Sequence, residues 1–540
     1  MSDLNGPTVA PSLESSTATR GTLLILAWSA LLAACLWQFT ADDAYIVYRY
    51  AENAAAGQGL VYNAGETISA LTSPGHALVC TLLAVLQIPL QLGNKVLGMA
   101  GLVFSGLLVS RHVACSPSVR SLALLLVVGS PLAVVWSVGG LETSLLMLGL
   151  TSLVVLSPSL KSRPRDSQLA WYSLLAGACF LLRHDSALFL TPCVVHQIGS
   201  QLRRPRATVR PVLLLSLPAA ALSFGWLGFS AFYYHDVLPT SFYTKTPSFN
   251  WPWMALNAIY MVQFVLLTGL VLLFLASRRS AATDKTAPSP LPAAGNPGQQ
   301  LGVSIGLAVT FVYGLGMVTS HMMFAYRFLL PYLPVAVILT AGLAGRRRAV
   351  ASGSARLELT LACCLQLGML ACLLWVSLNP GAVGEYRHLT ISQYSQFLAT
   401  LDSQAEKIRQ HWNTHPGPDR RPIIFVYAAG RIGHQLQTAH VVDGNLLSYR
   451  HVFADRNEPS GVSLSADYVM AIVGPRHGTL DQQLGGRLHG YQRIARTTFR
   501  FDGQQEHFDL YFNKNPAPLR LPRYIDGSLD SDASTDRSMQ

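Results

Sequence analysis

The chain has 540 residues, of which 50% are hydrophobic and only 12% are charged. A soluble protein would carry about a quarter charged residues, so this composition excludes an ordinary water-soluble enzyme. Many uncharged apolar runs reach the ~20 residues that cross a hydrocarbon core, which predicts an α-helical polytopic membrane protein. Much of the net charge of +11 lies in short loops between those runs, where Lys and Arg set topology, so it gives no reason to expect nucleic acid as a partner.

The N-terminal segment leads into a first membrane crossing. Residues 1–20 are rich in Ser, Thr and Pro and are expected to form a disordered cytoplasmic tail. An apolar run then predicts a crossing over about residues 21–40. No small-residue cleavage site clearly ends this run, so we interpret it as a helix that stays in the membrane.

The next stretch, residues 42–76, is the most polar one in the N-terminal part of the chain. It begins with two adjacent carboxylates, Asp42 and Asp43, at the point where the apolar run ends. Desolvation and mutual repulsion both favour the neutral form of such a pair, so at least one of the two is expected to have a perturbed pKa. Arginine and tyrosine side chains follow, among them Arg49 and Tyr62. We interpret this loop as a chemical site at a membrane surface.

The topology follows from the basic loops between the later apolar runs. Positive-inside reasoning places all of these loops in the cytoplasm, and only an odd number of crossings joins an outer Asp42 loop to the first basic loop at Arg111. The run over residues 76–92 is therefore assigned to an interfacial helix within a first outer loop of residues 41–95. About eleven crossings result, with the C-terminus outside. After the first, they are expected at residues 96–113, 121–138, 141–157, 169–183, 185–201, 211–233, 255–276, 301–320, 328–345 and 357–378.

This topology brings the remaining polar clusters to the same outer side as Asp42. They surround Glu142, Arg183 to Asp185, Tyr233 to Lys245, and His321 to Arg327. Ionisable residues at membrane depth are costly unless they line a site. Their convergence on one face predicts a functional site there.

The chain is expected to contain two folded parts. Residues 21–378 form the transmembrane domain, interrupted by a Pro/Gly/Ala-rich cytoplasmic linker at 281–300. Residues 379–525 have the composition of a soluble domain, and a helix followed by strands predicts a small α/β fold outside the membrane. The helix is expected at 392–412, the strands are expected at 423–427, 441–443, 468–473, 494–501 and 508–512, and a disordered tail is expected at 526–540.

Five segments in this order resemble one family. They are DDAYIVYRYAENAAAGQGLVYNAGE, GLETSLLMLGL, LLRHDSALFL, YYHDVLPTSFYTK and YRFLLPYLP. The likeness covers residues 20 to about 345 and, more loosely, the outer domain. Together they look like the polytopic GT-C glycosyltransferases related to bacterial cell-envelope arabinofuranosyltransferases. The sequence departs from the commonest pattern at His184-Asp185, where a Pro followed by an acidic residue is usual, and in lacking a Gly-Asp-Trp before Arg327.

The resemblance implies a specific reaction. The donor would be a sugar, with arabinofuranose expected, carried on a polyprenyl phosphate, and an inverting transfer would take place on the periplasmic side of a bacterial inner membrane. The acceptor would be a cell-envelope glycan, lipopolysaccharide or protein. By position, Asp42 or Asp43 would be the general base. Some members of this superfamily use a divalent cation and others do not. Since the adjacent acids are not a D-x-D motif and no His/Cys cluster supplies ligand spacing, no metal ligands are assigned.

The candidate cations each have a structural alternative. Arg327 suits bidentate binding of the lipid phosphate, although an arginine at the end of a crossing also serves as an interfacial anchor. His235 and Lys245 share one loop, and Lys245 is either a second phosphate contact or a solvated charge. His184 is a weaker candidate for the donor phosphate, because Arg183 and Asp185 on either side are expected to pair with each other.

The remaining candidates leave two interpretations open. Glu142 begins a crossing after a Gly-Gly turn, so it either stabilises the helix N-terminus or binds sugar hydroxyls and orients Asp43. Arg49 and Tyr62 are expected to line the pocket, while aromatic residues at an interface are also typical of a belt. In the outer domain, Gly430 to His434 follows a strand and is interpreted as a βα turn.

Two other classes of function compete with a transferase. A flippase or transporter for lipid-linked sugar would show internal repeats and broken crossings near the midplane. The polar residues here gather on one face instead, which disfavours transport. The third class is a non-catalytic scaffold whose outer domain recognises glycan.

Overall fold

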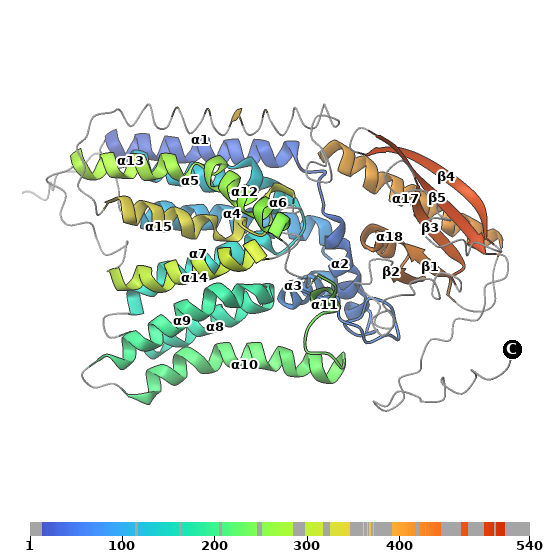
Figure 1. Cartoon of the computed structure of the whole chain (residues 1–540), viewed down its shortest axis with the longest axis horizontal. Coiled ribbons are helices and arrows are strands. Elements are labelled where there is room, and N and C mark those ends of the chain that lie inside the picture. Colours follow the sequence, from blue (N-terminus) through green and yellow to red (C-terminus); the bar gives the residue numbers. More distant parts are fainter. Residues whose placement is uncertain are drawn as a thin grey trace, which may run out of the picture.

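The chain forms a helical bundle joined at one end to a smaller domain built on a β-sheet (Figure 1). The structure is a computed structural model. It describes residues 13–113, 117–160, 164–204, 208–245, 251–283, 297–316, 324–345, 391–415, 421–426, 428–443, 466–473, 491–501 and 504–513, with a few isolated positions between 360 and 371.

The bundle helices lie roughly side by side, and the short helices α2, α3 and α11 gather at the end next to the sheet domain (Figure 1). The helices are α1 (Leu13–Cys35), α2 (Asp42–Ala55), α3 (Pro74–Val85), α4 (Leu90–His112), α5 (Pro117–Val128), α6 (Pro131–Val138), α7 (Thr143–Leu156), α8 (Asp166–Leu182), α9 (Ala187–Leu202), α10 (Val209–Tyr233), α11 (Thr240–Lys245), α12 (Trp251–Leu267), α13 (Leu270–Thr283), α14 (Pro297–Gly316) and α15 (Leu333–Gly345).

The described residues contain three helical segments that are long and apolar enough to cross a membrane, or up to five if each of two bent pairs is one span. The three are α4, α7 with the turn that follows it, and α10. Large apolar side chains of α10 such as Phe224 and Phe232 are exposed, as lipid-facing residues would be. The composition and these helices make the chain a helical membrane protein.

The expected number of about eleven crossings is not confirmed. The segment expected at 121–138 is the bent pair α5 and α6, because Pro131 starts a new helix at an angle of 44° to the preceding one. The segment expected at 255–276 bends by 47° between α12 and α13. Several other segments form shorter apolar helices, and most of 357–378 lies outside the described residues.

Two helices near the N-terminus differ in extent from the expected segments. Helix α1 begins at Leu13, inside the segment expected as a disordered tail, because the sequence LESSTATR contains neither Gly nor Pro to oppose a helix. Within the run expected as an interfacial helix, α3 is 12 residues long, too short for the ~20 residues of a span. Most of the linker at 281–300 and all of the tail at 526–540 lie outside the described residues.

The C-terminal domain is a five-stranded mixed sheet with helices α17 (Ile391–Thr414) and α18 (Ala429–Gln435). The strand order is β2-β1-β3-β5-β4; β1 pairs in parallel with β2 and β3, whereas β5 pairs antiparallel with β3 and β4. The strands are β1 (Ile423–Val426), β2 (His440–Asp443), β3 (Tyr468–Val473), β4 (Tyr491–Phe501) and β5 (Gln504–Asn513). All five expected strands and the expected helix are therefore present.

One hydrophobic cluster runs from the bundle into the C-terminal domain. It includes Leu36 and Tyr45 on the bundle side and Leu398, Ile424 and Ile432 on the domain side. A continuous apolar core of this kind holds the domain against the end of the bundle.

Candidate active site at the end of the bundle

Helix α2 begins with the two carboxylates, and they point to different neighbours. A helix turns by about 100° per residue, so two adjacent side chains cannot share a face. Asp43 is 54% exposed and accepts a hydrogen bond from Nη1 of Arg327 at 2.8 Å. Asp42 faces the C-terminal domain instead. The structure therefore separates the two candidates for the base.

Asp43 is the first member of a row of charges, here called the charge cluster: Asp43, Arg327, Glu142, Arg183 and Asp185. Arg327 Nη2 lies 3.7 Å from Glu142 Oε1, and Arg183 Nη1 lies 3.4 Å from the same oxygen. Arg183 also binds both carboxylate oxygens of Asp185, at 2.9 and 2.6 Å. The expected pairing of Arg183 with Asp185 is thus present, and it extends into a larger network.

Unusual backbone conformations at two places fix the positions of Glu142 and Arg327 in the charge cluster. Gly140 has a φ of 81°, and a Cβ there would meet the hydroxyl oxygen of Tyr48 at 2.4 Å, so only glycine fits the turn that precedes Glu142. Ala325 and Tyr326, directly before Arg327, have φ values of 47° and 57°. Such values are uncommon for residues other than glycine and occur where a fixed site over-determines the backbone.

The guanidinium of Arg327 is held between a carboxylate and an aromatic ring. Its central carbon lies 5.3 Å from the ring centre of Trp136, and its side chain is only 11% exposed. Within the described part of the chain, buried Nε of Arg327 and buried Oε2 of Glu142 make no hydrogen bond. Since unsatisfied buried polar groups are costly, these two atoms mark positions where a polar ligand would be stabilised.

Asp42 binds the start of helix α18. Its carboxylate accepts hydrogen bonds from the backbone N–H groups of Arg431, at 2.7 Å, and Gly430, at 3.2 Å. Burial, with the nearby charge of Asp43, raises the pKa of Asp42 to about 7, although the two N–H donors act in the opposite direction. The expected perturbed pKa therefore belongs to the carboxylate that contacts the C-terminal domain.

Glycines permit this contact. A Cβ at Gly430 would meet the backbone oxygen of Asp42 at 2.1 Å, and one at Gly433 would meet the hydroxyl oxygen of Tyr62 at 2.1 Å. The segment that the sequence suggested as a βα turn is thus the short helix α18, packed directly onto α2.

Arg49 and Tyr62 lie at the same domain interface, and none of the contacts observed for them is with the charge cluster. Arg49 is 1% exposed and donates to the backbone oxygens of Tyr62, Gly433, Leu436 and Ala439 and to the side chain of Asn63. These five bonds match the five N–H donors of a guanidinium. The hydroxyl of Tyr62 donates to the backbone oxygen of Ala429 at 2.6 Å. Both residues therefore hold the C-terminal domain on the first loop.

The three remaining candidates are placed as follows. His184 lies between Arg183 and Asp185, where burial lowers its pKa to about 4 and keeps the ring neutral. His235 is exposed, with a φ of 56°. Lys245 ends helix α11, and its side chain lies outside what the structure describes.

The described residues do not group ligands for a metal ion. Among them, no set of three or more His, Cys, Asp or Glu side chains is placed to hold one. Asp43 and Glu142 both lie against Arg327, whose charge opposes a cation between them.

Sequence reasoning did not identify Trp136 or the role of Arg183 in the charge cluster. Both signals were present, since Trp136 precedes the Gly139-Gly140 turn and Arg183 ends α8 at the same side of the bundle. Their contacts depend on helix packing, which no local motif specifies.

No protein-family model and no curated protein matches this chain. Among solved structures, it is similar to the crystal structure of ArnT from Cupriavidus metallidurans bound to undecaprenyl phosphate, with 12% sequence identity over 90% of this chain and 97% of that chain. The TM-score is 0.49, which is too low for this likeness to support an argument about function.

Proposed function

We propose that this chain is an integral-membrane glycosyltransferase. It transfers a sugar, with arabinofuranose as the expected sugar, from a polyprenyl-phosphate donor to a glycan, lipopolysaccharide or protein acceptor of the cell envelope. The observation that carries the proposal is the exposed carboxylate of Asp43 beside the guanidinium of Arg327, whose side chain is only 11% exposed. The five ordered motifs shared with GT-C enzymes support the same class.

Asp43 is proposed as the general base. Its exposed carboxylate is accessible to an acceptor hydroxyl, whereas the carboxylate of Asp42 is engaged by α18. Asp43 takes the hydroxyl proton as the acceptor oxygen attacks the anomeric carbon from the side opposite the phosphate. The bond between that carbon and the phosphate oxygen breaks, and its electron pair leaves on the phosphate. The anomeric configuration is therefore inverted.

Arg327 is proposed to bind the departing phosphate. Its Nη1 is engaged with Asp43 and its Nη2 lies near Glu142, while Nε has no hydrogen-bond partner among the described residues. An arriving phosphate competes with Asp43 for the guanidinium, which is suited to bidentate contact with phosphate. Binding of the donor then weakens the contact between Arg327 and the exposed Asp43 carboxylate, so the base can turn to the acceptor hydroxyl when the leaving group is in place.

The charge balance requires a further cation near the phosphate. The charge cluster contains three carboxylates and two guanidiniums, so it has a formal charge of −1 when all five are ionised. Lys245 and His235, in the loop after α10, are proposed to supply the additional positive charge or hydrogen-bond donors. Glu142 is proposed to orient Arg327, and its second oxygen to accept a sugar hydroxyl.

The cellular setting of the reaction is also proposed. The active-site end of the bundle and the C-terminal domain face the periplasm, and the bundle lies in the inner membrane. Basic loops at the opposite ends of the helices, such as Arg203 to Arg210 between α9 and α10, favour this orientation.

A reconstituted assay tests this function. The full chain is placed in lipid vesicles with a panel of radiolabelled polyprenyl-phosphate pentoses and hexoses and an envelope fraction as acceptor. We expect transfer of label to the acceptor, and Asp43→Asn lowers turnover by about 10²- to 10⁴-fold because the proton acceptor is lost.

The control is Asp166→Asn. Asp166 is an exposed aspartate at the opposite end of α8 from the charge cluster, paired with Arg210, so its removal leaves turnover unchanged. If instead the wild-type chain moves labelled lipid across the bilayer without acceptor, and Asp43→Asn does so equally well, the chain is a lipid-linked sugar transporter. If neither transfer nor movement occurs with any donor, both functions are wrong.

A further inference from the structure

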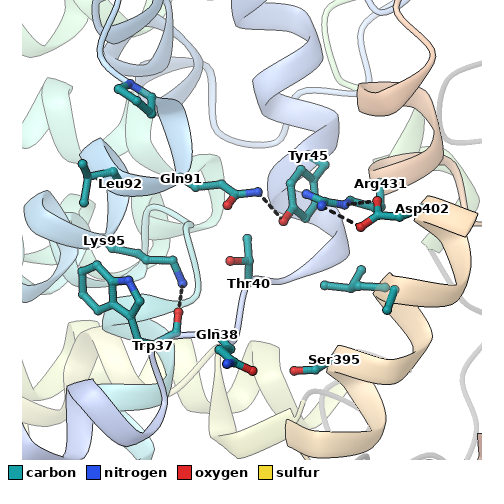
Figure 2. A pocket seen from close by; sticks show the side chains of 13 residues that line it. Trp37, Gln38, Thr40, Tyr45, Gln91, Leu92, Lys95, Ser395, Asp402 and Arg431 are labelled. Carbon is teal, nitrogen blue, oxygen red and sulfur yellow. Dashed lines mark hydrogen bonds and ion pairs between the residues drawn. The ribbon is translucent and has the colours of Figure 1, made fainter. Parts of the chain in front are cut away.

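A hollow lies between the bundle and the C-terminal domain. Its volume is about 460 Å³, and it is bordered by the chain after α1, the start of α4, the first turn of α2, and helices α17 and α18 (Figure 2). No member of the charge cluster is among the described residues that line it. The hollow is therefore separate from the proposed active site.

The two cations that line the hollow are already engaged. Nζ of Lys95 donates to the backbone oxygens of Trp37, at 2.6 Å, and Phe39, at 2.5 Å, and it lies 5.4 Å from the ring centre of Trp37. Arg431 donates to both carboxylate oxygens of Asp402, at 2.7 and 2.9 Å. Figure 2 shows the two cations on opposite sides of the space.

These pairings disfavour an anionic ligand. A phosphate or carboxylate entering the hollow would meet the Asp402 carboxylate and would compete with backbone oxygens for Lys95. Like charges in one site are destabilising, and the desolvated anion would need donors that are not already engaged.

The remaining lining groups suit hydroxyls. Gln38, Gln91 and Ser395 present two amides and a hydroxyl, each of which offers both donors and acceptors, whereas the Thr40 side chain is buried and hydrogen-bonded with Tyr45. Nε2 of Gln91 donates to the hydroxyl of Tyr45 at 2.7 Å, so this amide is fixed in place (Figure 2). A hydroxyl group also both donates and accepts, and it needs no counter-charge.

Trp37 adds a flat apolar surface. Its side chain borders the hollow and is 40% exposed, and an indole ring buries a large area against an apolar face at low entropic cost. Few ligand classes combine many hydroxyls with an apolar face, and sugar rings have both. We propose that this hollow binds a neutral saccharide at a second site, apart from the charge cluster.

The proposal goes beyond the transferase function and does not depend on it. A saccharide held here lies between α17 and the bundle and contacts both folded parts at once. It would keep a glycan chain at the domain junction whether or not the chain catalyses transfer.

Saturation-transfer NMR tests the site. The full chain is prepared in phosphatidylcholine nanodiscs without sugar-based detergent, which would itself occupy a saccharide site. The probes are methyl glycosides and disaccharides of arabinose, mannose, galactose, glucose and N-acetylglucosamine. We expect at least one probe to receive saturation, and the double variant Gln38→Ala/Ser395→Ala to weaken its binding roughly 10-fold or more through the loss of two hydrogen-bonding groups.

The matched control is Gln58→Ala/Ser403→Ala. Gln58 and Ser403 are exposed, neither lines the hollow, and Ser403 lies on the same helix as Ser395, so binding should equal that of the wild type. The proposal is overturned if no probe binds, if binding is equal in the two double variants, or if glycerol 3-phosphate displaces the bound saccharide at equal or lower concentration. The NMR experiment measures saccharide binding, whereas the vesicle assay measures transfer of labelled sugar. A negative result in one of them therefore does not decide the other.

Discussion

The groups around Asp42 and those around Asp43, on two sides of α2, differ in what they contact and in what they can do. On the Asp42 side, a half-buried carboxylate, a buried arginine and a buried tyrosine hydrogen-bond to backbone groups of the C-terminal domain. On the Asp43 side, an exposed carboxylate contacts the guanidinium of Arg327. The Nε of this guanidinium makes no hydrogen bond to any residue that the structure describes. Buried and satisfied groups maintain a structure, whereas accessible and incompletely satisfied ones are available to a ligand.

The largest effect, on the free energy of unfolding, is expected when the arginine of the domain interface is removed. Arg49→Met leaves the backbone oxygens of Tyr62, Gly433, Leu436 and Ala439 without this donor, so the free energy of unfolding should fall by about 3 kcal/mol or more. Thermal unfolding and limited proteolysis of the C-terminal domain measure this change.

Arg409→Met is the control for that variant. Arg409 is exposed on α17, where it pairs with Glu406 and donates one exposed hydrogen bond to the backbone oxygen of Gln435, so its loss should change stability by about 1 kcal/mol at most. If both variants unfold alike, the interface does not depend on Arg49, and the contrast between the two sides of α2 fails.

The second effect concerns the charge cluster. Arg327→Lys keeps the positive charge but removes the planar fork, so kcat/KM for the lipid donor should fall about 10- to 100-fold while stability changes little. Arg210→Lys, at an exposed ion pair with Asp166, serves as the control and should keep full activity. Equal activity of the Arg327→Lys variant and the wild type would remove the phosphate role from this residue.

The third effect is a pH dependence of stability that arises from Asp42. Burial raises the pKa of Asp42 from its ordinary value of 3.8 to about 7 in the folded chain, so the folded state binds this proton more tightly than the unfolded state. The stability that this proton contributes is fully present below pH 3.8 and decreases between pH 3.8 and about pH 7. It is lost above about pH 7.

Melting temperatures between pH 5 and pH 8 measure this dependence. The wild type should lose a few degrees over that range through Asp42, and Asp42→Asn should remove that part of the loss. Asp43→Asn is the comparison: it removes the nearby charge that adds to the effect of burial on Asp42, so it should reduce the slope with pH less than Asp42→Asn does. Identical slopes for the wild type and Asp42→Asn would contradict the assignment.

The smallest effect tests the ring beside Arg327. Trp136→Leu removes a cation–π contact worth about 0.5–1 kcal/mol, so transfer should slow by roughly two- to fivefold. Trp28, which is part of the same hydrophobic cluster but hydrogen-bonds to Gly129, gives a matched Trp28→Leu control for lost apolar volume. A larger loss for the control than for Trp136→Leu would place the effect in packing instead of in Arg327.

Several features of this molecule follow from the sequence by itself. The apolar composition indicates a helical membrane protein, because a long apolar run in lipid must hydrogen-bond its own backbone groups, and a helix does so within one segment. The strands at 423–427 and 468–473 and the helix at 392–412 were predictable to within a few residues, because their apolar periodicity and flanking turns are local signals. The charged motifs near Asp43, Glu142, Arg183 and Arg327 could likewise be recognised from the sequence.

Only the tertiary structure decided what each of those residues does. The sequence cannot tell Asp42 and Asp43 apart, because they are adjacent residues of the same type. In the structure, the helix directs their side chains about 100° apart, toward Arg431 and Arg327, which lie hundreds of positions away in the chain. Arg49 and Tyr62 look like pocket residues in sequence and became interface residues because α18 packs on them. Contacts between distant segments depend on how helices pack, and local sequence patterns carry no information on that packing.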